Sequence, residues 1–91
     1  MRVIVNVALE PMYRLRLTYA GGEAVTVDFA RVIALGGALA PLKDRKYFSQ
    51  VSIGAAGRSL EWPGGIDFCA DALWLEGKEG GVFPGDAESA A

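Results

Sequence analysis

The chain opens with three segments in which apolar and polar residues alternate. Residues 2–9 (RVIVNVAL), 13–19 (YRLRLTY) and 23–29 (EAVTVDF) each show this pattern. A two-residue period is typical of a strand with one buried face. Pro11 lies between the first two segments and residues 20–22 (AGG) between the last two, and both are turn sequences. We therefore predict three strands joined by tight turns.

The alternation also predicts which residues face the core. In the first strand it assigns one apolar face to Val3, Val5, Val7 and Leu9. For the following hairpin, a three-residue turn with Gly22 in the left-handed conformation matches apolar residues across the strands. The expected pairs are Leu17 with Val25, Leu15 with Val27, and Tyr13 with Phe29. This register also sets Arg14 opposite Asp28, an ion pair that helps to specify it.

The two-residue period stops after Phe29, and helical signals follow. Residues 30–35 (ARVIAL) predict a short helix that the glycines at 36–37 end. Residues 38–42 are expected to cross the surface as a connection. Asp44 is a good N-cap for a second short helix extending to about Gln50.

A second hairpin and a last helix complete the predicted fold. The turn at residues 55–58 allows Ile53 to pair with Leu60 and Val51 with Trp62, which keeps apolar residues on one face. Glycines 64–65 break this strand, and a final helix is expected at about residues 70–76. We predict an α+β fold: a small antiparallel sheet built from two hairpins plus an N-terminal strand, with two or three short helices packed on one face. The single domain spans residues 1–76, and residues 77–91 form a flexible, acidic, Gly-rich tail.

Composition excludes most hydrolytic mechanisms. The 91 residues include no His and a single Cys, so neither a Ser-His nor a Cys-His pair exists. Cys69 has no partner for a disulfide, and a thiolate zinc site would need more ligands. The N-terminal apolar run is much shorter than the roughly 18 residues of a membrane span. We expect a cytoplasmic, non-enzymatic protein without a cofactor or a bound metal.

Charge gives little attraction toward nucleic acid. Residues 1–76 carry eight basic and eight acidic residues, so the predicted domain is neutral. The best basic cluster is Lys43, Arg45 and Lys46, which Asp44 interrupts. Three cations form a weak phosphate-binding surface, so a solvated turn and helix start is the favoured explanation. A nucleic-acid regulator using this cluster, with Arg14 and Arg16, is an alternative function.

The carboxylates Glu61, Asp67 and Asp71 offer a second alternative. They lie close in sequence around the expected start of the last helix, and such a group could hold a hard cation for catalysis. Acidic residues are also favoured at helix starts by the free backbone amides alone, which is the simpler explanation. Cys69 lies beside them and is interpreted as a small buried apolar residue rather than a reactive thiol.

Aromatic residues supply the candidate surface for a protein partner. Trp62 and Trp74 are the largest side chains of the chain, and in a small domain both are expected in the core. A partly exposed tryptophan is a typical anchor of a protein interface. We therefore take Trp62, Trp74 and the intervening Asp67 as candidate contacts.

A longer motif runs through the same region. Residues 62–74 (WPGGIDFCADALW) resemble the W-P-N-G-x-D-x-x-P-D-x-L-Y signature of a small bacterial family, domain of unknown function 2442. The order of the other motifs agrees over residues 3–76: the hairpin ending in VDF, then PLKD and a following Phe. Gly64, Ala70 and Trp74 depart from the usual Asn, Pro and Tyr.

The resemblance implies a small α+β domain with no assigned reaction and no catalytic residue to transfer. Some members of that family carry an appended helix-turn-helix segment, and others resemble half of a two-gene toxin-antitoxin-type pair. This chain continues instead into a Gly-rich segment, so we expect no attached DNA-reading module. The sequence thus predicts a protein-binding or regulatory domain, an antitoxin-like partner of a protein encoded by an adjacent gene, with homo-oligomers also compatible.

Overall fold

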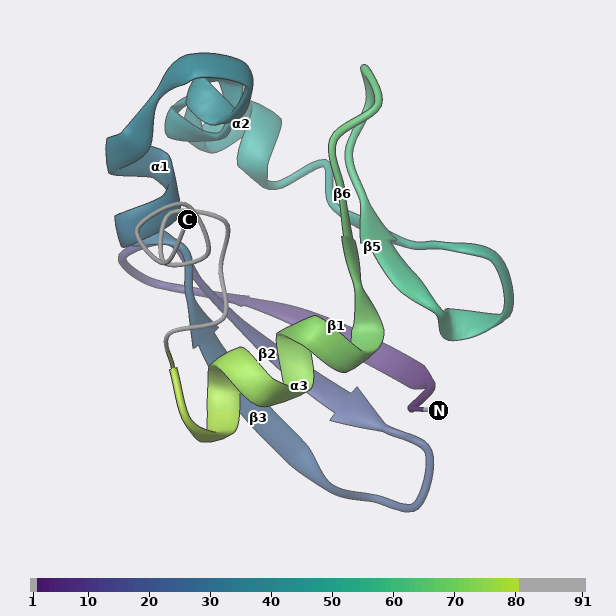
Figure 1. The fold of residues 1–91 in the computed structure, drawn as a ribbon. Helices are drawn as coiled ribbons and strands as arrows, with labels where there is room; N and C mark the ends of the chain where they lie inside the picture. The colour runs from purple at the N-terminus through teal and green to yellow at the C-terminus, as the bar shows by residue number, and fades with distance from the viewer. Residues whose placement is uncertain (1, 81–91) are drawn as a thin grey trace, which may run out of the picture.

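The computed structural model describes residues 2–80, which fold into two three-stranded antiparallel sheets with short helices between and beside them (Figure 1). The predicted α+β class is confirmed. The expected single sheet is divided in two, because the second hairpin pairs with a further strand of its own rather than with the first hairpin. Residues 81–91, most of the predicted tail, lie outside the described residues.

The first sheet has the order β1-β2-β3, with β1 spanning Ile4–Glu10, β2 Arg14–Tyr19 and β3 Ala24–Asp28. The predicted register of the β2-β3 hairpin is confirmed, including Leu17 opposite Val25. Gly22 adopts a positive φ of 96° at the turn. Arg14 also lies opposite Asp28, and their charged atoms are 3.9 Å apart.

The predicted inward face of β1 is wrong at its start. Ile4 is 2% exposed and lies opposite Tyr19, whereas Val5 is 54% exposed. A β-bulge between Ile4 and Asn6 causes the change, because one extra residue reverses the alternation of side chains. Beyond the bulge, Leu9 lies opposite Leu15 as the pattern requires, but this edge strand leaves it half exposed.

Two short helices follow the first sheet. Helix α1 spans Ala30–Leu35 as predicted, and Gly36 ends it with φ of 70°. The expected surface connection is instead a 3-10 helix, η1, spanning Gly37–Lys43. Its Leu42 is completely buried and attaches the segment to the core.

The third short helix, α2, spans Arg45–Phe48, with Asp44 as its N-cap. The Asp44 carboxylate accepts a hydrogen bond of 2.9 Å from the Lys46 backbone amide. The predicted cap is therefore confirmed, although the helix ends before Gln50. Two further hydrogen bonds tie α2 to the second sheet: the Trp62 indole donates to the Phe48 carbonyl, and the Tyr47 hydroxyl donates to that of Pro63.

The second sheet has the order β4-β5-β6. Strand β4 (Ser52–Ile53) leads through a 3-10 turn, η2 (Ala55–Gly57), to β5 (Ser59–Glu61). The predicted pairing of Ile53 with Leu60 is confirmed. Strand β6 (Asp67–Cys69) was not predicted and pairs with β5 after the glycine turn.

The last helix, α3, spans Ala70–Lys78 and continues past the predicted end at Glu76. It lies across one face of the first sheet (Figure 1). The contact with β3 is close at Gly77, where a Cβ atom would lie 2.8 Å from the Val25 Cβ. Gly77, expected to begin the tail, is thus a packing residue of the domain.

One continuous apolar core joins the two sheets, the helices and the aromatic residues. Phe29 lies at its centre, with ring centroids 5.3 Å from Phe68, 5.7 Å from Phe48 and 5.8 Å from Trp62. These rings meet edge to face, the arrangement that aromatic quadrupoles favour. The core therefore holds the second sheet against the first through side chains rather than through strand pairing.

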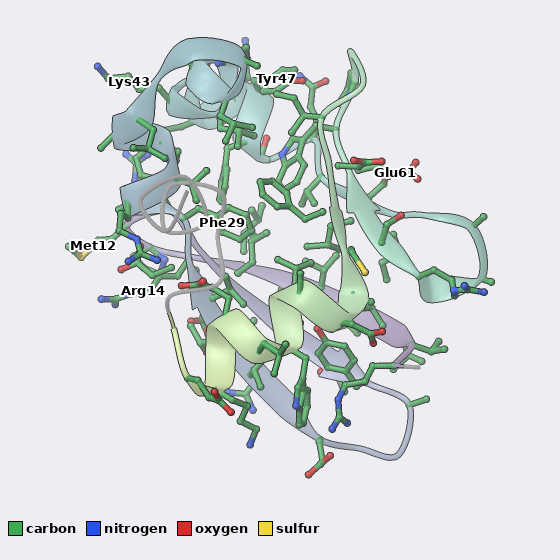
Figure 2. All side chains as sticks on the ribbon, viewed as in Figure 1. Met12, Arg14, Phe29, Lys43, Tyr47 and Glu61 are labelled. Carbon is green, nitrogen blue, oxygen red and sulfur yellow. The ribbon has the colours of Figure 1, made fainter. Side chains whose placement is uncertain are left out.

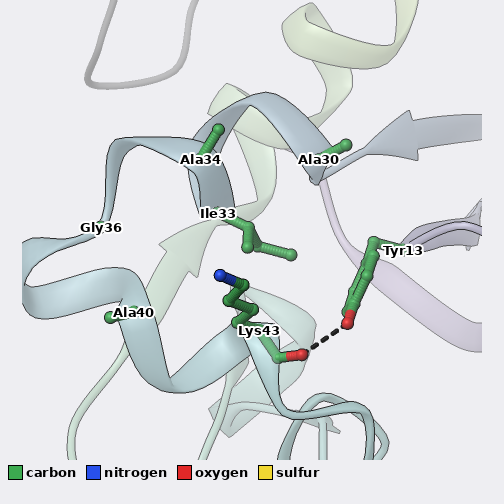
Figure 3. A pocket seen from close by; sticks show the side chains of 7 residues that line it. All are labelled: Tyr13, Ala30, Ile33, Ala34, Gly36, Ala40 and Lys43. Carbon is green, nitrogen blue, oxygen red and sulfur yellow. Dashed lines mark hydrogen bonds between the residues drawn. The ribbon is translucent and has the colours of Figure 1, made fainter.

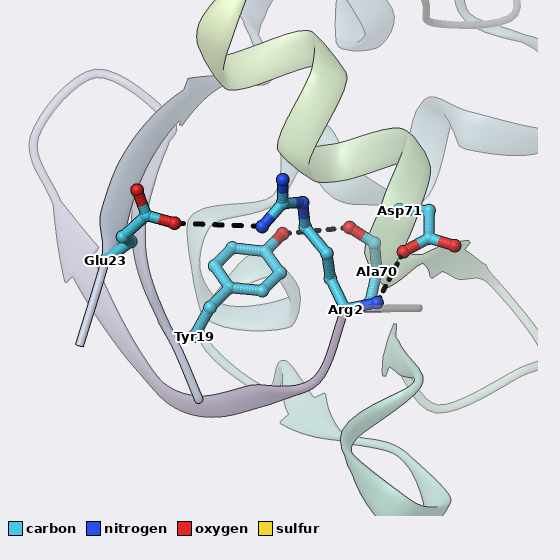
Figure 4. Close-up of polar contacts among 5 residues, drawn as sticks. All are labelled: Arg2, Tyr19, Glu23, Ala70 and Asp71. Atoms are coloured by element: carbon cyan, nitrogen blue, oxygen red, sulfur yellow. Dashed lines mark hydrogen bonds and ion pairs between the residues drawn. The ribbon is translucent and has the colours of Figure 1, made fainter. Parts of the chain in front are cut away.

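The start of α3 is tied to the N-terminal segment and to β2 (Figure 4). The Tyr19 hydroxyl donates a 2.9 Å hydrogen bond to the Ala70 carbonyl, and the Arg2 amide donates one of 2.8 Å to the Asp71 carboxylate. Tyr19 is 1% exposed, and this burial raises the pKa of its hydroxyl to about 12.

Candidate functional site

An open apolar hollow lies between α1, η1 and the turn that precedes β2 (Figure 3). Its volume is about 560 Å³, within the range of ligand-binding clefts. We call it the alanine hollow, and it is lined by Tyr13, Ala30, Ile33, Ala34, Gly36, Ala40 and Lys43. The three alanines are exposed to solvent, and Ile33 is 8% exposed.

Local sequence explains how these elements form a concave surface. Ala30, Ile33 and Ala34 follow the helical spacing that places side chains on one face of α1. Gly36 and Gly37 both have positive φ, so the chain reverses directly after the helix. This reversal brings η1, with Ala40 and Lys43, to the other side of the hollow.

Tyr13 enters the hollow from a strained turn. Met12 and Tyr13 have φ of 65° and 61°, left-handed values that cost non-glycine residues free energy. The Tyr13 hydroxyl donates to the Lys43 carbonyl, and its ring meets the edge of Phe48 at 5.3 Å. Met12, which precedes Tyr13 in the same strained turn, is 66% exposed. Strain of this kind persists where surrounding contacts fix it, often at functional sites.

The hollow is chemically simple. Tyr13 and Lys43 carry its only polar side chains, and the Tyr13 hydroxyl already has a partner. Small residues on both walls let a bulky apolar group approach the backbone closely. The Lys43 ammonium gives the rim a positive charge. This arrangement suits binding of an apolar group that lies next to an anion.

The first residue of the predicted basic cluster, Lys43, lines this hollow. Lys43 ends η1, and Arg45 and Lys46 begin α2, and all three are exposed. Arg14 lies well away from Lys43, on the first sheet (Figure 2). Arg14 is paired with Asp28, and Arg16 lies on the same outer sheet face. The structure therefore groups three of the five candidate cations.

The three candidate carboxylates do not converge. Glu61 and Asp67 lie opposite each other on β5 and β6, and Ser59 donates a 3.1 Å hydrogen bond to Glu61. Asp71 begins α3 and accepts the Arg2 amide. Among residues 2–80, no three acidic or sulfur-bearing side chains come close enough to hold a metal ion. The hypothesis of a three-carboxylate cation site therefore does not fit the fold.

The candidate partner contacts differ in exposure. Trp62 and Trp74 are 4% and 8% exposed and belong to the core, whereas Asp67 is exposed. Cys69, expected to be buried, is a free and exposed thiol, because it occupies an outward position of β6. Trp62 and Trp74 therefore expose too little surface to be the main contacts of a protein partner.

Sequence reasoning missed the alanine hollow. Its walls come from residues 30–35, assigned only as a short helix, and from residues 38–42, assigned as a plain connection. The available signal was the recurrence of small residues at 30, 34, 36 and 40 around one large Ile33. Small residues that face solvent on a short helix leave room for a neighbour.

Comparison with known proteins identifies the family. Residues 4–79 match the family described as Protein of unknown function (DUF2442), and the chain belongs to this family. No curated protein matches the chain. Within residues 2–80, no helix has the length and apolar character needed to cross a membrane.

One solved structure is similar to this fold. It is the crystal structure of a protein from Nitrosomonas europaea named as a putative DNA-binding protein, which is 34% identical with a TM-score of 0.74. The match covers 87% of this chain and 50% of that one. This chain therefore corresponds to about half of its structural relative.

Proposed function

We propose that this chain is a non-enzymatic module that binds a protein partner through the alanine hollow. The observation that carries the proposal is the hollow itself, which is open, apolar and about 560 Å³ in volume, and which has three exposed alanines in its lining. Exposed apolar surface that is concave and rimmed by charge is typical of interaction sites. The strained turn that places Tyr13 in the wall supports the same conclusion.

The chemistry of the hollow defines the partner. The alanines and glycine leave space for a bulky aliphatic or aromatic side chain, and Ile33 forms an apolar base. Lys43 at the rim, followed along the chain by the exposed Arg45 and Lys46, favours carboxylates. We therefore propose a protein segment with an apolar anchor followed by acidic residues. A protein encoded by an adjacent gene, as expected for an antitoxin-like pair, would be one such partner.

Site-specific crosslinking tests this proposal. A photoreactive residue replaces Ala34 in the hollow or, as the control, Thr26 on the exposed outer face of β3. We expect the Ala34 position alone to crosslink a discrete protein in cells, through a segment that pairs an apolar residue with Asp or Glu. Lys43→Glu should reduce this product.

Binding of the purified partner then gives the decisive measurement. Ala34→Trp fills the hollow and should weaken binding by at least about tenfold, equivalent to about 1.4 kcal/mol, whereas Thr26→Trp leaves it unchanged. Equal crosslinking from both positions, or unchanged affinity of the Ala34 variant, contradicts the proposal.

Association with DNA is the second candidate function. It is supported by the similarity to the Nitrosomonas europaea protein and by the exposed cluster of Lys43, Arg45 and Lys46. The neutral charge of the domain weighs against strong binding, because phosphate contacts supply most of the non-specific affinity.

Salt dependence measures this second function directly. Three phosphate contacts predict an affinity loss of roughly 40-fold between about 50 and 200 mM salt. Anisotropy of labelled duplex DNA should show this slope for the wild type and lose it in K43A/R45A/K46A. Arg58→Ala removes an exposed cation outside the cluster and serves as the control. Binding that is absent at low salt excludes the DNA function.

A further inference from the structure

We infer that residues 81–91 of this chain bind the alanine hollow in cis and compete there with the protein partner. The inference rests on the proposed function in one respect, namely that the hollow is a binding surface. It adds the identity of the occupant in the isolated chain. The argument depends on where α3 delivers the chain and on the residues that follow it.

The end of α3 is held against α1, one wall of the hollow. The Glu76 carboxylate lies 3.3 Å from the Arg31 guanidinium, and only 9% of the Glu76 side chain is exposed. Gly80 then donates a 3.0 Å hydrogen bond to the Glu76 carbonyl, so the chain leaves the helix from this position. Arg31 directly follows Ala30, which lines the hollow. The next residues therefore start beside the helix that carries the site.

The following sequence has the chemistry that the hollow requires. Val82 and Phe83 form an apolar pair, and Asp86 and Glu88 come after it. No Lys or Arg is present in residues 81–91. This order matches apolar walls with one cation, Lys43, at the rim and two more, Arg45 and Lys46, directly after it along the chain. Three residues of extended chain span about 10 Å, which is the greatest distance that can separate the Phe83 backbone from Gly80.

Covalent attachment makes a weak contact sufficient. A short flexible linker gives an effective concentration in the millimolar range, so a segment too weak to bind as a separate peptide occupies its site in cis. Gly80 and Gly81 have the composition of such linkers. A partner with better complementarity can then displace the segment, which makes the segment a competitor of modest strength.

Nuclear magnetic resonance of the labelled full-length chain tests the inference. We expect nuclear Overhauser contacts between the Phe83 ring and the methyl groups of Ile33 and Ala34. Phe83→Ala should abolish them and shift the methyl signals of Ala30, Ala34 and Ala40. Ser89→Ala, in the same segment, should leave these signals unchanged.

Charge exchange provides a second, independent variant series. Lys43→Glu should weaken the Phe83 contacts, and adding D86K and E88K should restore them. Contacts that disappear on dilution would show that a second copy supplies the segment, and this result overturns binding in cis. The absence of any Phe83 contact with the hollow overturns the inference as well.

The failure of this inference and that of the proposed function are distinguishable. If Phe83→Ala leaves the hollow signals unchanged while Ala34→Trp still weakens partner binding, only the segment inference fails. If the Phe83 contacts are present while the partner ignores Ala34→Trp, the proposed partner site fails instead. If both hold, Phe83→Ala should tighten partner binding several-fold, because the competitor is removed.

Discussion

The central carbon of the Arg2 guanidinium lies over the Trp74 ring, 3.6 Å from the ring centroid. The Lys78 ammonium lies 4.9 Å from the same ring. Two cations from opposite ends of the described chain thus contact one tryptophan, and Arg2 is also 3.7 Å from Glu23 (Figure 4). This arrangement fastens the N-terminal segment to α3.

Replacing Arg2 should therefore loosen both ends of the domain. Arg2→Ala is expected to lower the free energy of unfolding by about 1 kcal/mol, because it removes a cation–π contact on a ring that is 8% exposed. Arg2→Lys should recover only part of this loss, since an ammonium does not stack as a guanidinium does. Urea denaturation followed by circular dichroism gives the measurement. Equal stability of wild type and Arg2→Ala would contradict the assigned role.

Tyr19 predicts a loss of stability at alkaline pH. Burial raises its pKa from 10.0 to about 12 in the folded chain. Below pH 10 both folded and unfolded states keep the proton, so the buried hydroxyl contributes fully. Between pH 10 and 12 the unfolded chain loses its proton first, and the free energy of unfolding falls.

Tyr19→Phe separates this effect from other titrations. At neutral pH it should cost about 1 kcal/mol, because the buried Ala70 carbonyl loses a hydrogen bond. The difference between wild type and Tyr19→Phe should shrink as pH rises above 10. Denaturation at several pH values checks both statements, and a constant difference would refute the assignment.

Gly77 should respond to alanine in the opposite direction from an ordinary helix position. Gly→Ala inside a helix normally stabilises by about 1 kcal/mol. Here the added methyl group would lie 2.8 Å from the Val25 Cβ. We expect Gly77→Ala to destabilise the domain by about 1–3 kcal/mol, since α3 must move away from β3. Ala72→Gly in the same helix calibrates the intrinsic propensity, and a stabilised Gly77→Ala would disprove the close packing.

The strained turn gives a prediction in which stability and binding separate. Met12→Gly relieves a left-handed conformation and should raise the free energy of unfolding by up to about 1 kcal/mol. It also removes an apolar side chain that is 66% exposed and precedes Tyr13 of the hollow, so we expect partner binding to weaken. Ala56→Gly relieves the same conformation, φ of 58°, away from the hollow. This control should gain stability without a change in binding.

The sequence predicted the fold where two independent signals agreed. The β2-β3 register followed from apolar pairing and from the opposition of Arg14 and Asp28, and both hold in the structure. The face of β1 could not be predicted, because a bulge has no residue signature of its own. Strand β6 escaped detection because three residues are too few to show a period. Its pairing with β5 adds a third strand to the second hairpin, whose sheet is separate from the first.

Prediction of the candidate site was weaker for a physical reason. We predicted Trp62 and Trp74 as partner contacts because large aromatic residues are frequent at interfaces. In the structure both side chains fill the small core instead. The hollow is made instead by side chains that are small, such as Ala34 and Ala40, and its shape exists only once Gly36 and Gly37 reverse the chain. Concavity is a property of the folded backbone, which a residue pattern does not encode locally.

The two tryptophans occupy different parts of the fold, so their fluorescence can report on each part. Trp62 sits among Phe48 and Phe68 and senses the junction with the second sheet, whereas Trp74 senses α3 on the first sheet through its contact with Tyr19. Fluorescence of single-tryptophan variants therefore follows each half separately during denaturation. Coincident curves would mean that the two small sheets unfold as one cooperative unit.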